Sequence, residues 1–246
     1  MAAAPRTTSS GLVIYRLNVK QYLKIIGSGI LPGGARVELL GGLILDNRRR
    51  SRTPSASGLV PYRLSARQYE AMIIAGVFPE GAHVELLGGL LVDKMSKNPP
   101  HSIASGQARD LLATIVPAGW FVDEAKAIEI ARRSRPEPDV IVVRGRRHDY
   151  RIRPPGPSEL AIVIEVSDST YFKDRGAKWW RYAAARILIY WIVNIPKRQI
   201  EVYSDSTGRG RMAAYRACTV YGEDAEVPVM IDGRECGRIA VRDLLI

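Results

Sequence analysis

Two short apolar runs that each carry one carboxylate constrain the fold of this chain more than any other feature. The first begins at Asp139 and continues Val-Ile-Val-Val, and the second, residues 160–167, contains Glu165. Proline and glycine flank these runs, which is typical of buried β-strands. A carboxylate in such a strand is costly to bury unless it is paired or binds a metal. The sequence therefore predicts two buried strands whose acids form a polar site.

Several motifs accompany the two acids in a fixed order. They are Pro136–Asp139, Val163–Asp168, Asp174–Lys178 and Tyr190–Asn194, with Val84–Gly89 and Lys97–His101 upstream. In order and spacing they resemble the Uma2 family of restriction-endonuclease-like proteins, a branch of the PD-(D/E)XK nuclease superfamily, over roughly residues 58–246. The resemblance implies an α/β fold of restriction-endonuclease type, in which a mixed sheet is flanked by helices. It also implies a Mg²⁺-dependent endonuclease that hydrolyses DNA phosphodiester bonds.

The two acids are the predicted metal ligands. Phosphodiester hydrolysis needs a metal ion that polarises the phosphoryl oxygen and lowers the pKa of a bound water. Mg²⁺ takes few carboxylates and keeps several waters. Asp139, Glu165 and the carbonyl of Val166 form the expected partial shell for Mg²⁺, with Mn²⁺ as the alternative ion. The simpler interpretation is that both acids form ordinary salt bridges with arginines.

The resemblance implies roles for three further residues. Lys178 ends the Asp-Arg-Gly-x-Lys motif, whereas the simplest superfamily pattern places a lysine where this chain has Ser167. From a helix beginning near Lys173, Lys178 would orient the attacking water or stabilise developing charge; the alternative is a surface lysine. Glu85 matches the N-terminal Glu-Leu of the family and would complete the metal shell or hold Lys178. His101 is a candidate general base or phosphate contact, or a helix cap.

The charge of the chain points to a polyanionic partner. Its formal net charge is +11 and its sequence pI is about 9.9. Such an excess suits nucleic acid, and with the resemblance it favours DNA. Clustered arginines are the candidate phosphate contacts, which would position DNA without reading its sequence; the alternative is a solvated surface loop. These candidates are Arg132, Arg133, Arg135, Arg144, Arg146 and Arg147.

Cysteine usage and hydropathy exclude several other classes. Cys218 and Cys236 form no CxxC pair, so a structural zinc site is not expected. The first ten residues lack the apolar core of a signal peptide and are expected to be disordered. No apolar stretch is long enough to span a bilayer, so the expected location is the cytoplasm, away from membranes.

An internal repeat dominates the N-terminal part. Gly11–Asp46 aligns with Gly58–Asp93 at a constant offset of 47, and 21 of the 36 positions are identical. Each copy is predicted to form one helix followed by a hairpin. We interpret residues 1–57 as a partial duplicate with a basic linker, and residues 58–246 as the nuclease-like domain.

Only the second copy is expected to lie at the edge of the catalytic sheet, because it connects directly to the motif that ends at His101. The first copy is then a redundant appendage that lies loosely on the surface or pairs with another molecule as a homodimer. Deleting residues 1–56 is expected to leave fold and catalysis intact and to reduce self-association.

Two other functions remain compatible with the sequence. The first is a catalytically silent nucleic-acid-binding module of the same fold. The second uses Asp139 and Glu165 as a glycosidase pair, which would need aromatic sugar platforms and one acid with a raised pKa. The basic surroundings argue against the glycosidase, and metal dependence separates all three functions.

Overall fold

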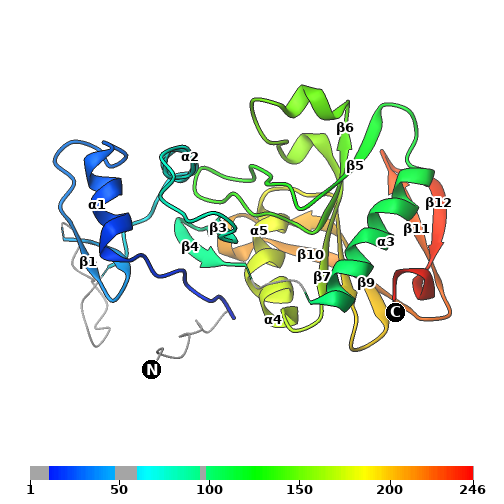
Figure 1. The fold of residues 1–246 in the computed structure, drawn as a ribbon. Helices are drawn as coiled ribbons and strands as arrows, with labels where there is room; N and C mark the ends of the chain where they lie inside the picture. The colour runs from blue at the N-terminus through cyan, green and yellow to red at the C-terminus, as the bar shows by residue number, and fades with distance from the viewer. Residues whose placement is uncertain (1–10, 48–59, 95–97, 246) are drawn as a thin grey trace. The chain divides into compact units, whose positions relative to one another are not determined.

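The computed structural model describes residues 11–47, 60–94 and 98–245 (Figure 1). Residues 1–10, which the sequence predicts to be disordered, and the linker between the repeats lie outside these ranges. The chain divides into two compact units, which are described separately below. The first consists mainly of Leu12–Lys94 with Ala131–Arg135, and the second mainly of Met95–Ile130 with Pro136–Ile246.

The first unit contains the two copies of the repeat, and each copy folds as one helix and one hairpin. Asn18 and Ser65 cap the two helices, each forming a capping box with the glutamine three residues later. Gly-Gly turns with positive φ connect the strands of both hairpins. The first copy forms α1 (Val19–Gly27), β1 (Val37–Leu40) and β2 (Leu43–Asp46), and the second forms α2 (Ala66–Ile74), β3 (Val84–Leu87) and β4 (Leu90–Asp93).

The first copy is not a loose appendage, and that expectation is wrong. Ile25 and Ile44 of the first copy are buried in one hydrophobic cluster with Leu64, Met72 and Leu86. The compact units therefore divide the chain elsewhere than at residue 57, because residues 60–94 share a core with the first copy. Whether residues 58–246 fold without residues 1–57 stays a prediction.

The second hairpin forms a two-stranded sheet in the first unit, in which β3 and β4 pair with each other. Its expected place at the edge of the large sheet stays a prediction. A main-chain bridge from Leu86 to Arg135 extends this hairpin within the first unit. Both copies of the repeat thus contribute to the same compact unit.

The second unit is built on a six-stranded mixed sheet, as the fold prediction required. Its strand order is β10-β9-β8-β7-β6-β5, and every neighbouring pair is antiparallel except β7 and β8. The parallel pair needs a crossover, which a helical segment after β7 supplies. The strands are β5 (Trp120–Glu124), β6 (Val140–Arg144), β7 (Leu160–Ser167), β8 (Ile189–Asn194), β9 (Gln199–Thr207) and β10 (Ala214–Gly222).

Both faces of this sheet are covered (Figure 1). Helix α3 (Pro99–Ile115) and the hairpin of β11 (Glu226–Ile231) with β12 (Arg234–Ala240) pack on one face, around residues such as Ile164 and Trp191. Helix α5 (Trp179–Ala184) packs on the other face through Tyr182 and Ala183, following the short α4 (Tyr171–Lys173). The mixed α/β fold with a sheet flanked by helices is therefore confirmed.

Two local features differ from what the residues alone predict. The sequence of residues 127–130 predicts a short strand, but they adopt no regular structure, although Ile128 and Ile130 are buried. The sequence predicts that Glu201 faces solvent, but it is buried and accepts hydrogen bonds from Tyr171 and Tyr203. Within the described residues, no helix is long and apolar enough to cross a membrane.

Candidate active site

Asp139 and Glu165 lie opposite each other on adjacent strands. Val140 pairs with Ile164 in the antiparallel ladder of β6 and β7, so the residue before β6 faces the residue after Ile164. The Asp139 N–H donates to the Ile164 carbonyl at 3.1 Å, which keeps this end of the ladder closed. Opposed residues of an antiparallel pair project to the same face of a sheet. Both acids are 2% exposed.

Two groups hold the Asp139 carboxylate. Oδ2 accepts the Val166 N–H at 2.9 Å, across the end of the ladder between β6 and β7. His101 Nε2 lies 3.1 Å from the same oxygen. His101 stands in the first turn of α3, whose N-cap is Asn98, so its ring is not the capping group. The first turn of α3 thus positions the His101 imidazole next to the Asp139 carboxylate.

Lys178 and Tyr182 converge on the other acid. Lys178 Nζ donates to Glu165 Oε1 at 2.7 Å, and the Tyr182 hydroxyl donates to the same oxygen at 2.7 Å. All three groups are buried. Lys178 is therefore not a surface lysine, and the helix after β7 points it at the predicted acid.

A π-helical turn at Asp174–Lys178 sets the direction of that lysine. The Trp179 N–H donates to the Asp174 carbonyl, a bond that spans one residue more than in an α-helix. Turns of this kind inside helices recur at functional sites. Lys178 is the last residue of this turn, directly before α5, and lies four residues before Tyr182, so both side chains reach Glu165.

Ser167 takes a different role from the lysine found there in the simplest superfamily pattern. Its hydroxyl donates to Asp174 Oδ2 at 2.7 Å, and the Thr170 hydroxyl donates to the same oxygen at 2.6 Å. Burial raises the pKa of the Asp174 carboxyl, and the nearby Lys178 opposes that shift. This network ties the end of β7 to the π-helical turn.

The donor set fits a hard cation that keeps most of its water. No group of three or more His, Cys, Asp or Glu side chains in the described ranges is arranged to hold a metal. Two carboxylates with a main-chain carbonyl suit Mg²⁺, which binds through one or two carboxylates. The N–H of Val166 points to the Asp139 side of β7, and its carbonyl shares that direction in extended backbone. The metal role of these three residues stays a prediction.

The remaining predicted residues lie away from this cluster or in the other unit. Glu85 lies on β3, opposite Val92, within the first unit. Arg132, Arg133 and Arg135 also belong to the first unit, where their segment pairs with the second hairpin. Their roles stay predictions.

Asp139 precedes the first residue of β6, whereas Arg144 is the last residue of that strand and Arg146 and Arg147 follow it. At about 3.3 Å per residue, Arg144 is about 16 Å from Asp139 along the strand. Arg144 forms an ion pair with Asp232 at 2.6 Å, and its guanidinium lies 4.3 Å from the centre of the Trp120 ring. Arg147 donates to the Val122 carbonyl. These groups could contact only a ligand that extends well past the acids.

Tyr182 and the pair of Ser167 with Asp174 escaped sequence reasoning. Tyr182 has the spacing of a core residue on its helix, and only the structure shows that its hydroxyl donates to Glu165. Ser167 stands where the simplest superfamily pattern has a lysine, so the sequence suggested no role for its hydroxyl. The position of Asp174 four residues before Lys178 was the available signal, since both then lie on one helix face.

Comparisons with known proteins give matches of two kinds. The family model described as "Uma2: Putative restriction endonuclease" matches residues 66–235. Among solved structures, the chain is similar to a crystal structure of a putative nuclease belonging to DUF820 from Anabaena variabilis ATCC 29413. That similarity has a TM-score of 0.47 and 14% identity, and covers 65% of this chain and 88% of the other. No curated protein matches the chain.

Proposed function

Because the chain belongs to the Uma2 family, whose description is putative restriction endonuclease, we propose that it hydrolyses DNA phosphodiester bonds with a divalent cation, Mg²⁺ or Mn²⁺. One observation carries the proposal. Asp139 and Glu165 are opposed on adjacent strands, and the Lys178 ammonium is hydrogen-bonded to one of them at 2.7 Å. A cationic group thus lies beside two buried acids, and this combination of groups is one that phosphoryl-transfer chemistry uses.

Asp139, Glu165 and the Val166 carbonyl are the residues that would hold the ion. When bound, the cation would polarise a phosphoryl oxygen and lower the pKa of a water. The Val166 N–H and His101 fix the orientation of the Asp139 carboxylate, so that acid needs no rearrangement.

Lys178 and Tyr182 have a separate task in this proposal. Both donate hydrogen bonds to Glu165 Oε1 and so hold that carboxylate in place. The Lys178 ammonium then lies where it can orient a water or stabilise negative charge that develops on the phosphate. His101, partly accessible at 12% side-chain exposure, is the group beside Asp139 that could accept a proton from that water.

A cleavage assay tests the proposal. Supercoiled plasmid and single-stranded DNA are incubated with the protein and Mg²⁺, Mn²⁺ or EDTA. We expect cleavage that EDTA abolishes, and a loss of at least about a hundredfold in Asp139→Asn and Glu165→Gln, since each removes a predicted ligand. Glu201→Gln is the matched control, because Glu201 is an equally buried carboxylate outside the pair. Metal-independent cleavage, or equal loss in the control, would contradict the proposal.

A silent binding module is the second candidate, and one observation favours it. Lys178 is buried and already engaged with Glu165, so the site could be closed to substrate. In that case the chain would bind DNA in the same salt-dependent way, but no ion would yield cleavage. Binding that Asp139→Asn leaves unchanged, with no cleavage in either protein, would support this candidate.

A further inference from the structure

The two copies of the repeat contact each other reciprocally in the first unit. The Tyr15 N–H donates to the Leu91 carbonyl at 3.1 Å. At the positions 47 residues apart, the Tyr62 N–H donates to the Ile44 carbonyl at 2.8 Å. Tyr62 is the equivalent of Tyr15, and Ile44 is the equivalent of Leu91. The same bond therefore forms twice, once in each direction.

A second main-chain bond repeats this exchange. The Asp93 N–H donates to the Val13 carbonyl at 2.8 Å, and the Asp46 N–H donates to the Val60 carbonyl at 2.8 Å. Between these bonds lie two isolated antiparallel bridges, Ile14 with Val92 and Leu45 with Pro61, which are also equivalent. The segment before each helix thus pairs with the last strand of the other copy.

Side chains follow the same rule. Gln21 Nε2 donates to the Val77 carbonyl at 3.1 Å, and Gln68 Nε2 donates to the Ile30 carbonyl at 3.3 Å. Gln68 is the equivalent of Gln21, and Ile30 is the equivalent of Val77. Each helix therefore reaches the loop after the other helix through its capping-box glutamine.

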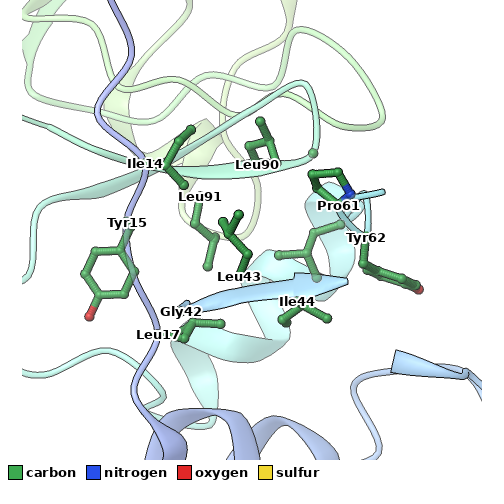
Figure 2. A pocket seen from close by; sticks show the side chains of 12 residues that line it. Ile14, Tyr15, Leu17, Gly42, Leu43, Ile44, Pro61, Tyr62, Leu90 and Leu91 are labelled. Carbon is green, nitrogen blue, oxygen red and sulfur yellow. The ribbon is translucent and has the colours of Figure 1, made fainter. Parts of the chain in front are cut away.

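A small cavity between the copies is lined by side chains from both of them (Figure 2). Its volume is about 20 Å³, and every residue that lines it from one copy has its equivalent from the other. The lining pairs are Ile14 and Pro61, Tyr15 and Tyr62, Leu17 and Leu64, Gly42 and Gly89, Leu43 and Leu90, and Ile44 and Leu91. Such a cavity lies on an approximate two-fold axis.

Reciprocal contact between equal surfaces defines an isologous interface, which normally joins two identical molecules. Here both surfaces belong to one chain. We propose that residues 12–46 occupy the surface of residues 60–93 that would otherwise bind the same helix–hairpin of a second molecule. The duplication then replaces a homodimeric contact with an internal one, and the partner this surface fits is another copy of the same segment.

The rest of the first copy agrees with this interpretation. Leu87 is fully buried, whereas its equivalent Leu40 is 53% exposed. Gly88 and Gly89 form further hydrogen bonds with the 131–135 segment, in which their N–H groups donate to Ser134 and Arg133. The two copies therefore bury equivalent residues where they contact each other, whereas Leu40 in the first copy is exposed where Leu87 in the second is buried.

The test disrupts the internal contact in the full chain. Ile14→Asp with Ile44→Asp places two charges in the interface from the first copy alone, so the second copy should lose its internal partner. We expect the wild type to sediment at its chain mass of 27.2 kDa and the variant to sediment as a concentration-dependent dimer. Adding Leu91→Asp should restore the monomer, because the dimer would use the second copy's own face. A dimer that tolerates this addition would overturn the proposal.

Disulfide trapping identifies the contact in that dimer. Pro61 faces Leu45 in the internal arrangement, so in a dimer of second copies it would face Val92 of the other molecule. Both bridges have the non-hydrogen-bonded geometry, with Cα atoms about 4.5 Å apart, within reach of a disulfide. With Cys218 and Cys236 changed to serine, Pro61→Cys with Val92→Cys should give a covalent dimer in the disrupted chain and none in the intact chain. The opposite pattern would contradict the proposal.

A second trapping experiment does not depend on how the charged variant folds. In the intact chain, Ile14→Cys with Val92→Cys and Leu45→Cys with Pro61→Cys should each close a disulfide within one chain. Reducing and non-reducing electrophoresis distinguish internal from intermolecular bonds. If only one of the two pairs closes, the copies are not reciprocally paired and the proposal fails.

Discussion

The Lys178 ammonium lies 2.7 Å from Glu165 Oε1, and both side chains are 2% exposed. A buried ion pair of this kind holds its geometry firmly, but removing one partner leaves an uncompensated charge. We therefore expect Lys178→Met to lower the free energy of unfolding by about 3–5 kcal/mol in addition to any loss of cleavage. Chemical denaturation measures the first effect and the plasmid assay the second.

The double variant Glu165→Gln with Lys178→Met separates stability from catalysis. It removes both charges, so most of the lost stability should return, because replacing a whole buried pair is close to neutral. Cleavage should stay absent. A double variant that recovers activity together with stability would show that neither Lys178 nor Glu165 takes part in cleavage.

The predicted metal ligands can be tested without measuring activity. A ligand that binds the folded state alone stabilises it by about 2.7 kcal/mol at a hundredfold excess over its Kd. Mg²⁺ and Mn²⁺ should therefore raise the Tm of the wild type by several degrees. Asp139→Asn should lose that shift, while Glu201→Gln should keep it. Equal shifts in all three proteins would place the ion elsewhere.

The buried Asp174 carboxyl predicts a pH dependence of stability. Its pKa is raised, chiefly by burial. The folded state then binds this proton more tightly than the unfolded state, whose pKa is about 3.9. The stabilisation is complete below that value and is lost as the pH rises through the folded pKa, by about 1.4 kcal/mol for each pH unit that separates the two pKa values. Asp174→Asn should lack this loss in denaturation curves recorded across the pH range.

Glu159 provides the matched case of opposite sign. Its hydrogen bond and ion pair with Arg153 hold its pKa at about 2. The folded state therefore stabilises the ionised form, so the contribution is present above the unfolded pKa and disappears as the pH falls toward 2. Glu159→Gln should cost at most about 1 kcal/mol near neutral pH, because the Arg153 partner is largely exposed, and nothing at the acid end. If Asp174→Asn and Glu159→Gln changed the pH dependence of the unfolding free energy in the same direction, these assignments would be contradicted.

The arginines after β6 can be distinguished by salt dependence. Each lost phosphate contact should reduce the slope of log K against log salt by about 0.9. Arg146→Ala should show this reduction, whereas Arg144→Ala should show less, since Asp232 already pairs with Arg144. Asp232→Asn frees that guanidinium and should steepen the slope. Unchanged slopes in all three variants would favour the solvated-loop interpretation.

The sequence was sufficient for the strands and acids of the site. Apolar runs bounded by proline and glycine predict β6 and β7, and opposed acids follow once those strands pair, which explains why Asp139 and Glu165 were expected on adjacent strands. Lys178 was found only through the family resemblance, because a lysine on a basic helix is uninformative by itself. The π-helical turn that aims it depends on tertiary contacts, which no local pattern specifies.

Glu201 and the repeat show where sequence reasoning failed. Glu201 lies on a strand that alternates as if one face were exposed to solvent, but it accepts hydrogen bonds from Tyr203 on the same strand and from Tyr171, which is 30 residues away in the sequence. Sequence identity between the copies established a duplication without showing which surface each copy buries. A surface that contacts its own equivalent leaves no mark in either copy read alone.

Deleting residues 1–56 tests the reciprocal pairing most directly. The sequence alone predicted less self-association after this deletion, and the shared core reverses that expectation. The second copy would expose Leu64, Leu90 and Leu91 where the first copy now packs, so the truncated chain should dimerise more than the full chain. The second unit should stay folded, because the buried residues of both its hydrophobic clusters begin at Ala104. Sedimentation at several concentrations, with the full chain as control, measures the difference. A truncated protein that folds yet stays monomeric would show that the surface has no affinity for its own copy.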